Sequence, residues 1–345
     1  MEGFDLYVEG YIQRMSSLKI EEKNNPHNSI NVRREVLNAE KRIKDYIRET
    51  PLEYSPYLSK MGRCDVFLKL ENIQLTGSFK VRGATNKILS LPKGTEVITA
   101  SSGNHGLAVA YTLSKLGGTG TIYLPITTTQ VKIDGLRNYD IPVEFYGSDC
   151  VEAEIFARNI ANRDNKVFIS PYNDLKIIGG QGTIAIELIR QLAKIDAVLI
   201  TIGGGGLISG VSGYLKQINP SIEIVGCLPQ NSAVMYESIK AGKIIDIESK
   251  PTLSDGSAGG IEPNAITFEL CQRFVDHYIL VNEEEIANAI LFILEKHHMV
   301  VEGAAGVTVA AYLKEKDRFK EKNVILIICG GNISIQQLKE IICNH

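Results

Sequence analysis

Lys80 stands where a helix is expected to begin. It follows an apolar run, DVFLKL (65–70), and a Thr-Gly-Ser turn, and it opens a helical pattern within ENIQLTGSFKVRGATNK (71–87). The helix dipole places positive charge at a helix start, so Asp and Glu are preferred there over Lys. Phe79, beside the lysine, indicates surroundings that are partly withdrawn from water. The amine therefore needs a reason to be there that local helix stability does not supply.

Three further candidate segments are strands that end in glycine or small polar residues and lead into helical patterns. In an open parallel sheet, ligands bind outside the carboxyl ends of the strands. Glycines let the backbone approach an anion, and free N–H groups at a helix start stabilise it. The four glycines 203–206 are the best phosphate cradle, although a tight strand–helix turn is the alternative reading. The three segments are VITASSGNHGLAVAY (97–111), VLITIGGGGLISGVSGYL (198–215) and VILIICGGNISIQQL (324–338).

Nucleotide signatures are missing from these segments. No G-x-G-x-x-G with a suitably placed acidic residue lies on an early strand, and no G-x-x-x-x-G-K-[ST] occurs. A phosphate site without them leaves phosphorylated cofactors and substrates. Pyridoxal phosphate needs a lysine for a Schiff base, a phosphate cradle, a partner for its ring nitrogen and contacts around its 3-oxygen. The chain offers candidates for all four, and Lys80 is the lysine.

The chain from about residue 60 supplies alternating strands and helices to carry these residues. The strand candidates are short, continuous and rich in Val and Ile, as strands buried on both faces of a parallel sheet should be. The segments between them are amphipathic and of helical length. This alternation predicts an α/β fold with parallel sheets. The predicted strands are DVFLKL (65–70), EVITA (96–100), GTIYL (120–124), PVEFYG (142–147), AVLITI (197–202), IEIVGC (222–227) and NVILIIC (323–329).

The segment before this alternation has a different pattern. In NVRREVLNAEKRIKDYIRETP (31–51), apolar residues from Val32 to Ile47 follow one helix face, and Pro51 ends the pattern. Residues 1–30 are polar and lack a strong period. They are predicted to form an N-terminal arm that frays or contacts an oligomer partner.

Composition restricts the class of protein. The chain has 345 residues, of which 44% are hydrophobic and 22% charged, as in soluble globular proteins of about two domains. Its 37 basic and 40 acidic residues are interleaved and give a net charge of -3, so nucleic acid is not expected as a partner.

Neither a signal peptide nor a membrane span is predicted. The N-terminus is acidic and lacks a basic segment followed by an apolar one, and the longest apolar stretch is broken by glycines. The six cysteines are scattered, without a CxxC pair or a His at metal-ligand spacing. This pattern favours reduced thiols in a cytoplasmic protein over a structural zinc site.

The motifs GSFKVRGA (77–84), SSGNHG (101–106), GGGGL (203–207) and CGGN (329–332) together resemble those of one family. The chain is identified by them as a member of the fold-type II (tryptophan synthase β-like) pyridoxal-phosphate enzymes of the serine/threonine dehydratase and serine racemase group. Further matches in the same order are TPL (50–52), GQGTIAIE (180–187) and VEGAAG (301–306). The resemblance implies two open parallel-sheet α/β domains and pyridoxal 5'-phosphate as the cofactor.

The resemblance assigns roles to single residues. Lys80 would hold the cofactor as a Schiff base and would later remove the α-proton, whereas a surface lysine is the alternative reading. Phe79 would lie beside the cofactor ring, although a Phe by itself is more often core. Asn104 would hydrogen-bond the 3-oxygen.

Two loops would hold the anionic groups. The phosphate would be wrapped by Gly203, Gly204, Gly205, Gly206 and Leu207. The substrate carboxylate would be received at a helix start, where an N-cap is a compatible second reading. The residues of that loop are Ser101, Ser102, Gly103, Asn104 and His105.

Cys329 would lie opposite the pyridine nitrogen. A neutral thiol cannot hold that nitrogen protonated as an aspartate would, so the ring should be a weaker electron sink. Loss of a β-leaving group soon after Cα–H cleavage fits such electronics. The alternative is that Cys329 is one more small buried residue, which is common for Cys.

Two departures from the family pattern matter. Metal-binding members carry acidic residues where this chain has Leu228 and Val234, and divalent metals need oxygen ligands. No metal site is therefore predicted from these side chains, although backbone carbonyls could hold a monovalent cation. The chain also ends soon after the cofactor motif, which argues against a regulatory amino-acid-binding domain.

The expected reaction is α,β-elimination of a 3-hydroxy amino acid, such as L-threonine or L-serine, to a 2-oxo acid and ammonia. The small residues in SDGSAGGIEPNAITFE (254–269) keep threo-3-hydroxyaspartate and phenylserine open as larger substrates. Amino-acid racemisation is the first alternative, because Ser102 matches the position of the second proton carrier in serine racemases. β-Replacement ranks lower, since those enzymes carry a threonine-rich loop in place of SSGNHG, and a non-catalytic binding role ranks last.

The resemblance also implies an architecture. A large cofactor domain would comprise residues 31–91 and 175–345, and a small mobile substrate domain would comprise residues 92–174. Closure of the small domain would expel water from the substrate. Homodimers are usual in this family, and a small amino acid would be the only other partner.

Overall fold

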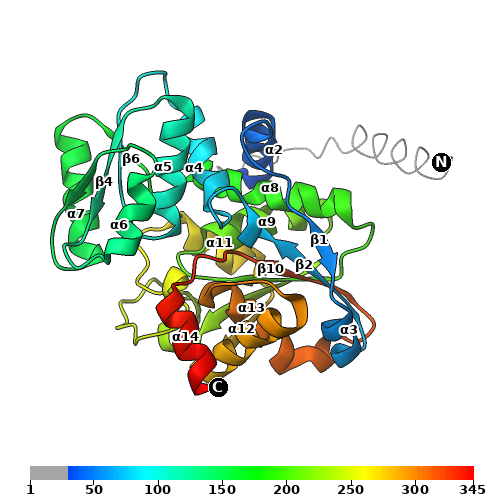
Figure 1. The fold of residues 1–345 in the computed structure, drawn as a ribbon. Helices are drawn as coiled ribbons and strands as arrows, with labels where there is room; N and C mark the ends of the chain where they lie inside the picture. The colour runs from blue at the N-terminus through cyan, green and yellow to red at the C-terminus, as the bar shows by residue number, and fades with distance from the viewer. Residues whose placement is uncertain (1–29) are drawn as a thin grey trace, which may run out of the picture. The chain divides into compact units, whose positions relative to one another are not determined.

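The structure, a computed structural model, describes residues 30–345, and its elements belong to the unit Val32–His345. The predicted arm, residues 1–30, lies outside the described residues except for its last residue. Two sheets organise this unit, one of six strands and one of four (Figure 1). The expected division into residues 31–91 with 175–345 and residues 92–174 stays a prediction.

The six-stranded sheet has the order β1-β2-β10-β7-β8-β9, and all of its strands are parallel except β1 at one edge. Strands β2, β7, β8 and β10 were predicted, and the bounds of β2 agree with the prediction. The edge strands β1 and β9 were not. The strands are β1 (Leu52–Tyr54), β2 (Asp65–Leu70), β7 (Ala197–Thr201), β8 (Glu223–Pro229), β9 (His277–Val281) and β10 (Asn323–Ile328).

The four-stranded sheet is parallel throughout, in the order β5-β4-β3-β6. The two-residue strand β6 was missed, because so short a run carries no readable period. Side chains alternate across the sheet: Tyr123 packs against α7, whereas Ile122 and Leu124 pack toward α5 and α6. The strands are β3 (Val97–Ala100), β4 (Gly120–Leu124), β5 (Val143–Phe145) and β6 (Val167–Phe168); the helices are α5 (Asn104–Leu116), α6 (Gln130–Arg137) and α7 (Cys150–Arg163).

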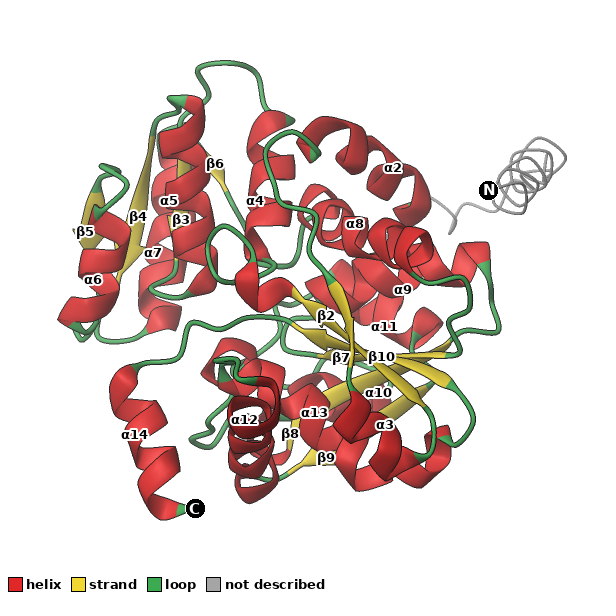
Figure 2. Ribbon diagram, turned by 45° about the vertical axis from the view of Figure 1, so that its right-hand side comes forward, coloured by secondary structure: helices red, strands yellow, loops and turns green. Residues whose placement is uncertain are grey.

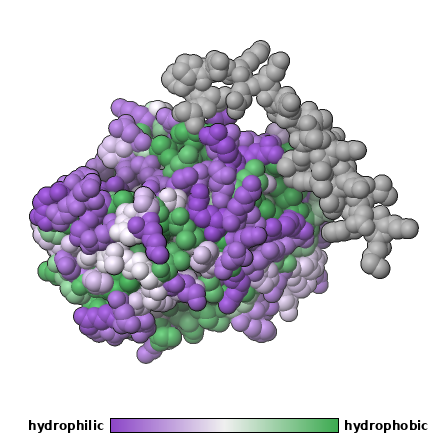
Figure 3. Space-filling view, turned by 90° about the horizontal axis from the view of Figure 1, so that it is seen from above, coloured by the Kyte–Doolittle hydropathy of each residue, from purple (hydrophilic) through white to green (hydrophobic). Residues whose placement is uncertain are grey.

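Helices cover both faces of the six-stranded sheet, which explains its continuous apolar strands. Figure 2 shows α8 and α9 on one face and α12 and α13 on the other. Hydrophilic and hydrophobic side chains are interspersed on the surface seen in Figure 3. No helix among residues 30–345 has the length and apolar character that a membrane crossing requires. The helices are α2 (Val32–Ile43), α3 (Pro56–Gly62), α4 (Lys80–Leu89), α8 (Leu175–Gln191), α9 (Gly206–Ile218), α10 (Val234–Ala241), α11 (Ile266–Phe274), α12 (Glu283–His297), α13 (Gly303–Glu315) and α14 (Ile335–Asn344).

Helix α2 is shorter than predicted. It ends at Ile43, although the apolar pattern continues to Ile47. The backbone N–H of Arg48 donates to the Gln74 side chain at 3.1 Å, and the Arg48 carbonyl accepts from it at 2.7 Å. These contacts hold the chain in a non-helical path toward β1. Ile47 still packs against the core, so the apolar pattern correctly indicates which residues are buried but not where the helix ends.

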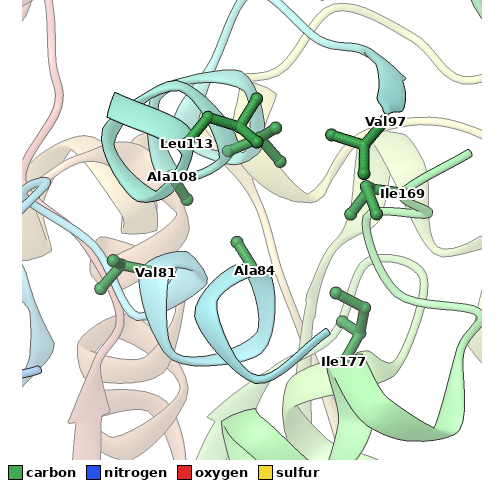
Figure 4. Packing of buried hydrophobic residues seen from close by; sticks show 8 residues of the cluster. Val81, Ala84, Val97, Ala108, Leu113, Ile169 and Ile177 are labelled. Atoms are coloured by element: carbon green, nitrogen blue, oxygen red, sulfur yellow. The ribbon is translucent and has the colours of Figure 1, made fainter. Parts of the chain in front are cut away.

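Helix α4, which begins at Lys80, is anchored by a cluster of apolar residues. Val81 and Ala84 pack with residues of α5 and with Ile169 and Ile177 (Figure 4). All four side chains are fully buried. This packing sets the start of α4 relative to α5 and to the segment that follows β6.

A buried ionic network anchors the other side of α4. Arg82 lies 2.8 Å from Glu71 and 2.6 Å from Glu187, and Lys69 lies 2.5 Å from the same Glu187. Burial would raise the pKa of Glu187, but Arg82 and Lys69 outweigh it and hold that pKa below its usual range. Two cations and two anions thus neutralise one another where α4, β2 and α8 meet. The network was not predicted, because Glu187, which binds both Lys69 and Arg82, lies 118 and 105 positions from them in sequence.

Candidate active site

Strand β10 holds the turn before Lys80. The Phe79 N–H donates to the Cys329 carbonyl at 3.0 Å, and the Gly331 N–H donates to the Gly77 carbonyl at 2.9 Å. Gly77 has a φ of +72°, a left-handed conformation that favours glycine. The turn therefore ties the position of Lys80 to the end of the central strand of the larger sheet.

The Lys80 amine has a carbonyl partner instead of a carboxylate. Its Nζ donates to the Pro171 carbonyl at 2.9 Å and lies 5.3 Å from the Phe79 ring centroid. Burial lowers the pKa of Lys80 to about 8, although the Glu302 charge acts to raise it. Far more of this amine is therefore free base near neutral pH than in an ordinary lysine, and the free base is the form that a nucleophile or base requires.

The loop after β3 opens into α5 at Asn104, with Gly103 at the cap position. The Gly103 N–H donates to Ser101 Oγ at 3.3 Å, and Ser102 is half-buried. His105 turns inward, where its Nε2 lies 3.0 Å from the Ile169 carbonyl oxygen. Burial and the charge of Lys80 lower the pKa of His105 to about 3, so its ring is neutral.

The glycine loop after β7 has no room for side chains. A Cβ on Gly204 would overlap the Tyr172 ring, and one on Gly203 would lie 2.9 Å from Ser257 Cα. Gly205 has a φ of +86°, and α9 begins at Gly206. The first N–H groups of a helix have no intrahelical acceptor, so this backbone suits an anion. Leu207, the next residue, is buried.

Cys329 follows the last residue of β10 and is 3% exposed. Burial raises the pKa of its thiol well above the usual range, and the Glu302 charge adds to the effect. A neutral thiol therefore lies behind the Lys80 turn, and its role as the partner of the ring nitrogen stays a prediction.

The structure brings these segments together through one connecting segment. Pro171 accepts from Lys80, and the next residue, Tyr172, covers Gly204 and Gly206. Three strand ends thus meet around the lysine: β10 through its backbone, β7 through the glycine loop and β3 through Asn104. Strands β7 and β10 are parallel neighbours in one sheet, so their carboxyl ends lie on the same edge. Strand β3 belongs to the other sheet, and the hydrogen bond between Asn104 and Asn332 joins its loop to the segment after β10.

Two residues of the site were missed by the sequence analysis. Glu302 accepts from Asn104 Nδ2 at 2.9 and 3.0 Å, and Asn332 Nδ2 donates to Asn104 Oδ1 at 2.7 Å. Both belong to motifs noted above, VEGAAG and CGGN, but a motif match does not reveal a contact partner. Burial raises the pKa of Glu302 to about 7, and Asp255 contributes to the increase.

Leu228 and Val234, the positions that argued against a metal, are both buried. Among residues 30–345, no group of three or more His, Cys, Asp or Glu side chains is arranged to hold a metal ion. Leu228 and Val234 therefore lie in the apolar interior and present no oxygen ligands from their side chains.

The residues fit pyridoxal phosphate on structural grounds. The glycine loop is a cradle that a Cβ would fill, and the α9 start supplies N–H groups for a phosphate. Lys80 supplies a partly neutral amine, and Cys329 a neutral thiol. With Asn104 as the candidate contact for the 3-oxygen, the chain offers one group for each of the four requirements of this cofactor.

Comparison with known proteins decides the family. Residues 43–330 match the family described as "Pyridoxal-phosphate dependent enzyme". This chain belongs to that family. Pyridoxal phosphate is accordingly its cofactor, and the predicted membership and fold class are confirmed.

Three proteins illustrate the similarity. The chain is 41% identical to the L-threonine ammonia-lyase of Thermotoga maritima over 311 residues, 89% of this chain and 77% of that protein. It superposes on threonine deaminase isoform 2 of Solanum lycopersicum with a TM-score of 0.86 and 33% identity, covering 91% and 93% of the two chains. For maize serine racemase the TM-score is 0.84, the identity 31% and the coverage 91% and 97%.

Proposed function

We propose that this pyridoxal-phosphate enzyme is an ammonia-lyase that converts L-threonine or L-serine to a 2-oxo acid and ammonia. The observation that carries the proposal is the partly desolvated amine of Lys80 at the meeting point of the three strand ends. The names of the relatives support it, because the Thermotoga maritima protein is an L-threonine ammonia-lyase and the Solanum lycopersicum protein a threonine deaminase.

The cofactor, when bound, withdraws electrons from the substrate Cα and so makes its proton removable. Lys80 takes that proton, since an amine with a pKa of about 8 is an effective base near neutral pH. The substrate carboxylate is held by the N–H groups of the Ser101–His105 loop at the α5 start. Loss of the β-hydroxyl then completes the elimination, and hydrolysis of the released enamine gives ammonia.

The remaining predicted residues hold the cofactor in this proposal. Gly203–Gly206 and Leu207 would bind its phosphate and Asn104 its 3-oxygen, while Phe79 would lie beside its ring and Cys329 would face its ring nitrogen. The raised pKa of the Cys329 thiol keeps that partner neutral. Beside the cofactor, this neutral thiol would favour early loss of the β-substituent.

Racemisation is the second candidate, and Ser102 is the observation in its favour. Ser102 lies half-buried two residues before the α5 start, in the loop assigned to the substrate carboxylate. Its hydroxyl would return a proton to the face of Cα opposite Lys80. The similarity to maize serine racemase supports this reading. Chiral analysis of recovered serine separates the two, because D-serine accumulating faster than pyruvate favours the racemase.

A substrate panel tests the proposal directly. Threonine, serine, threo-3-hydroxyaspartate and phenylserine of both chiralities are assayed for ammonia and 2-oxo acid. Release of both products from L-threonine or L-serine is expected. The Ala258–Gly260 segment is exposed and composed of small residues. Preference for one of the larger substrates would instead indicate that the β-substituent occupies the space beside this segment. Absence of ammonia from every member of the panel would overturn the proposal.

We also propose that the protein is a cytoplasmic homodimer. The homodimer comes from the family resemblance, and the cytoplasmic location from the scattered cysteines, which are free in the described residues. Sedimentation at several protein concentrations tests the oligomeric state.

A further inference from the structure

Glu302, Asn104 and Asn332 form a closed ring of hydrogen bonds. Asn104 Nδ2 donates to both carboxylate oxygens of Glu302, at 2.9 and 3.0 Å. Asn332 Nδ2 donates to Asn104 Oδ1 at 2.7 Å, and the Asn332 backbone N–H returns to Glu302 Oε2 at 3.1 Å. The ring therefore joins the starts of α5 and α13 to the segment after β10.

The ring determines which way the Asn104 amide points. A carboxylate only accepts hydrogen bonds, so it repels an amide oxygen and selects the amide nitrogen. Asn332 selects the opposite end of Asn104, because its own Nδ2 is a donor that also reaches the Thr76 carbonyl at 2.9 Å. Both neighbours therefore favour the same orientation of Asn104, with its nitrogen toward Glu302.

Glu302 is built into the protein at this place. It is 5% exposed, and its backbone N–H donates to the Gly330 carbonyl at 3.1 Å. A Cβ on Gly330 would lie 2.6 Å from the Glu302 carboxyl carbon, so only glycine fits beside it. The charged groups that act on Glu302 are Lys80, which lowers its pKa, and Asp255, which raises it.

We propose that Glu302 is a positioning residue for the cofactor: it orients the amide of Asn104 so that a second N–H of the same nitrogen is available to the cofactor's 3-oxygen. The inference rests on the role proposed for Asn104. An amide nitrogen carries two hydrogens, so one is held by Glu302 and the other serves the ligand. The pKa of about 7 for Glu302 supports the idea, because the carboxylate form that orients Asn104 is populated at neutral pH.

A double-mutant cycle on the holoenzyme tests the proposal. The pyridoxal phosphate dissociation constant is measured by absorbance titration for wild type, Glu302→Gln, Asn104→Ala and the double variant. Each single variant should bind the cofactor roughly tenfold more weakly, the effect of losing one well-placed hydrogen bond. The double variant should match Asn104→Ala within about twofold, because Glu302 acts only through Asn104.

A remote substitution on the same helix provides the matched control. Glu315→Gln, at the other end of α13, loses a 3.0 Å contact with His277 and should leave cofactor affinity unchanged. Asn332→Ala keeps the Glu302 carboxylate but opens the ring, and it should weaken binding as Glu302→Gln does. If Glu302→Gln does not fold, Asn332→Ala and the double variant Asn332→Ala with Asn104→Ala replace it in the cycle.

The outcomes are separable. Effects that multiply to about a hundredfold in the double variant, or an unchanged dissociation constant in Glu302→Gln, would overturn the proposal. The readout needs no substrate, so lack of elimination activity beside an intact cycle would refute the proposed function and leave this inference standing. A shift of the bound cofactor's visible absorption in Glu302→Gln, absent in the Asn104→Ala background, is the expected spectroscopic sign.

Discussion

The Lys80 amine donates a 2.9 Å hydrogen bond to the carbonyl of Pro171, a residue 91 positions further along the chain. This contact joins the catalytic candidate to the segment whose Tyr172 ring covers the glycine loop. The lysine that is unfavourable for its own helix start is thus held by a distant carbonyl and by the strand end behind it. A neutral acceptor, unlike a carboxylate, leaves the amine free to lose its proton.

Lys80→Ala should abolish covalent cofactor attachment and lower elimination activity by at least about 10³-fold, because attachment point and base are lost together. The visible absorption of the purified protein and its activity on threonine are the measurements. Lys87→Ala, on the same helix and paired with Asp174 at 2.6 Å, is the control and should change activity little. Retention of both activity and the absorption band by Lys80→Ala would contradict the proposed scheme.

Reconstitution of the cofactor-free protein should be faster at higher pH. Burial lowers the pKa of Lys80 to about 8, so the reactive free amine is scarce below that pH and dominant above it. The rate of cofactor attachment, followed by stopped-flow absorbance, should rise and level off with a midpoint near this value. In Glu302→Gln the midpoint should be lower, because the Glu302 charge raises the Lys80 pKa. A midpoint near 10.5, the ordinary lysine value, would show that the amine is fully solvated.

Glu71→Gln should lower the free energy of unfolding by about 3–5 kcal/mol, as breaking a buried ion pair leaves an uncompensated charge. Its partner Arg82 is fully buried and lies 2.8 Å away. Urea denaturation measures the change. Arg190→Ala, which removes half-exposed pairs with Glu40 and Glu49, should cost at most about 1 kcal/mol. Equal effects of the two substitutions would mean that the buried network is not a special source of stability.

Gly204→Ala should weaken cofactor binding by roughly tenfold or more, since its Cβ would displace the Tyr172 ring from the phosphate loop. Equilibrium titration with pyridoxal phosphate gives the affinity. Gly260→Ala is the matched glycine control, because a Cβ there meets nothing within 4 Å. Normal affinity in Gly204→Ala would place the phosphate elsewhere.

Cofactor affinity should fall as the pH is lowered through about 7. A protonated Glu302 has lost one acceptor for the ring that orients Asn104. In Asp255→Asn the midpoint should move to lower pH, because the Asp255 charge raises the Glu302 pKa. Glu302→Gln should remove this titration. Cofactor titrations at several values between about pH 5.5 and 8.5 measure this pH dependence of the affinity. An identical midpoint in wild type and Asp255→Asn would contradict the assignment of the titration to Glu302.

The sequence was a reliable guide where information is local. The apolar runs of β2 and β4 were read with their bounds, because buried parallel strands are continuous and the turns beside them are rich in glycine. Helix α4 begins at Lys80 as expected. The family followed from ordered motifs, and with it came the cofactor and the candidate residues.

The sequence was a poor guide where a partner lies elsewhere in the chain. Helix α2 stops at Ile43 because Gln74 binds Arg48, and edge strand β9 exists because β8 pairs with it. Neither the end of α2 nor the existence of β9 can be predicted from the sequence of that segment alone.

The amino-acid sequence by itself determined most of the strands, the cofactor and most of the chemical groups, because apolar runs, glycine loops and a lysine at a helix start are local features. Only the tertiary structure decided how those groups act on one another. Burial lowers the pKa of Lys80 and raises that of Glu302, and the ring through Asn332 orients Asn104. The physical reason is that desolvation and hydrogen-bond direction depend on neighbours in space, which the fold brings together from across the chain.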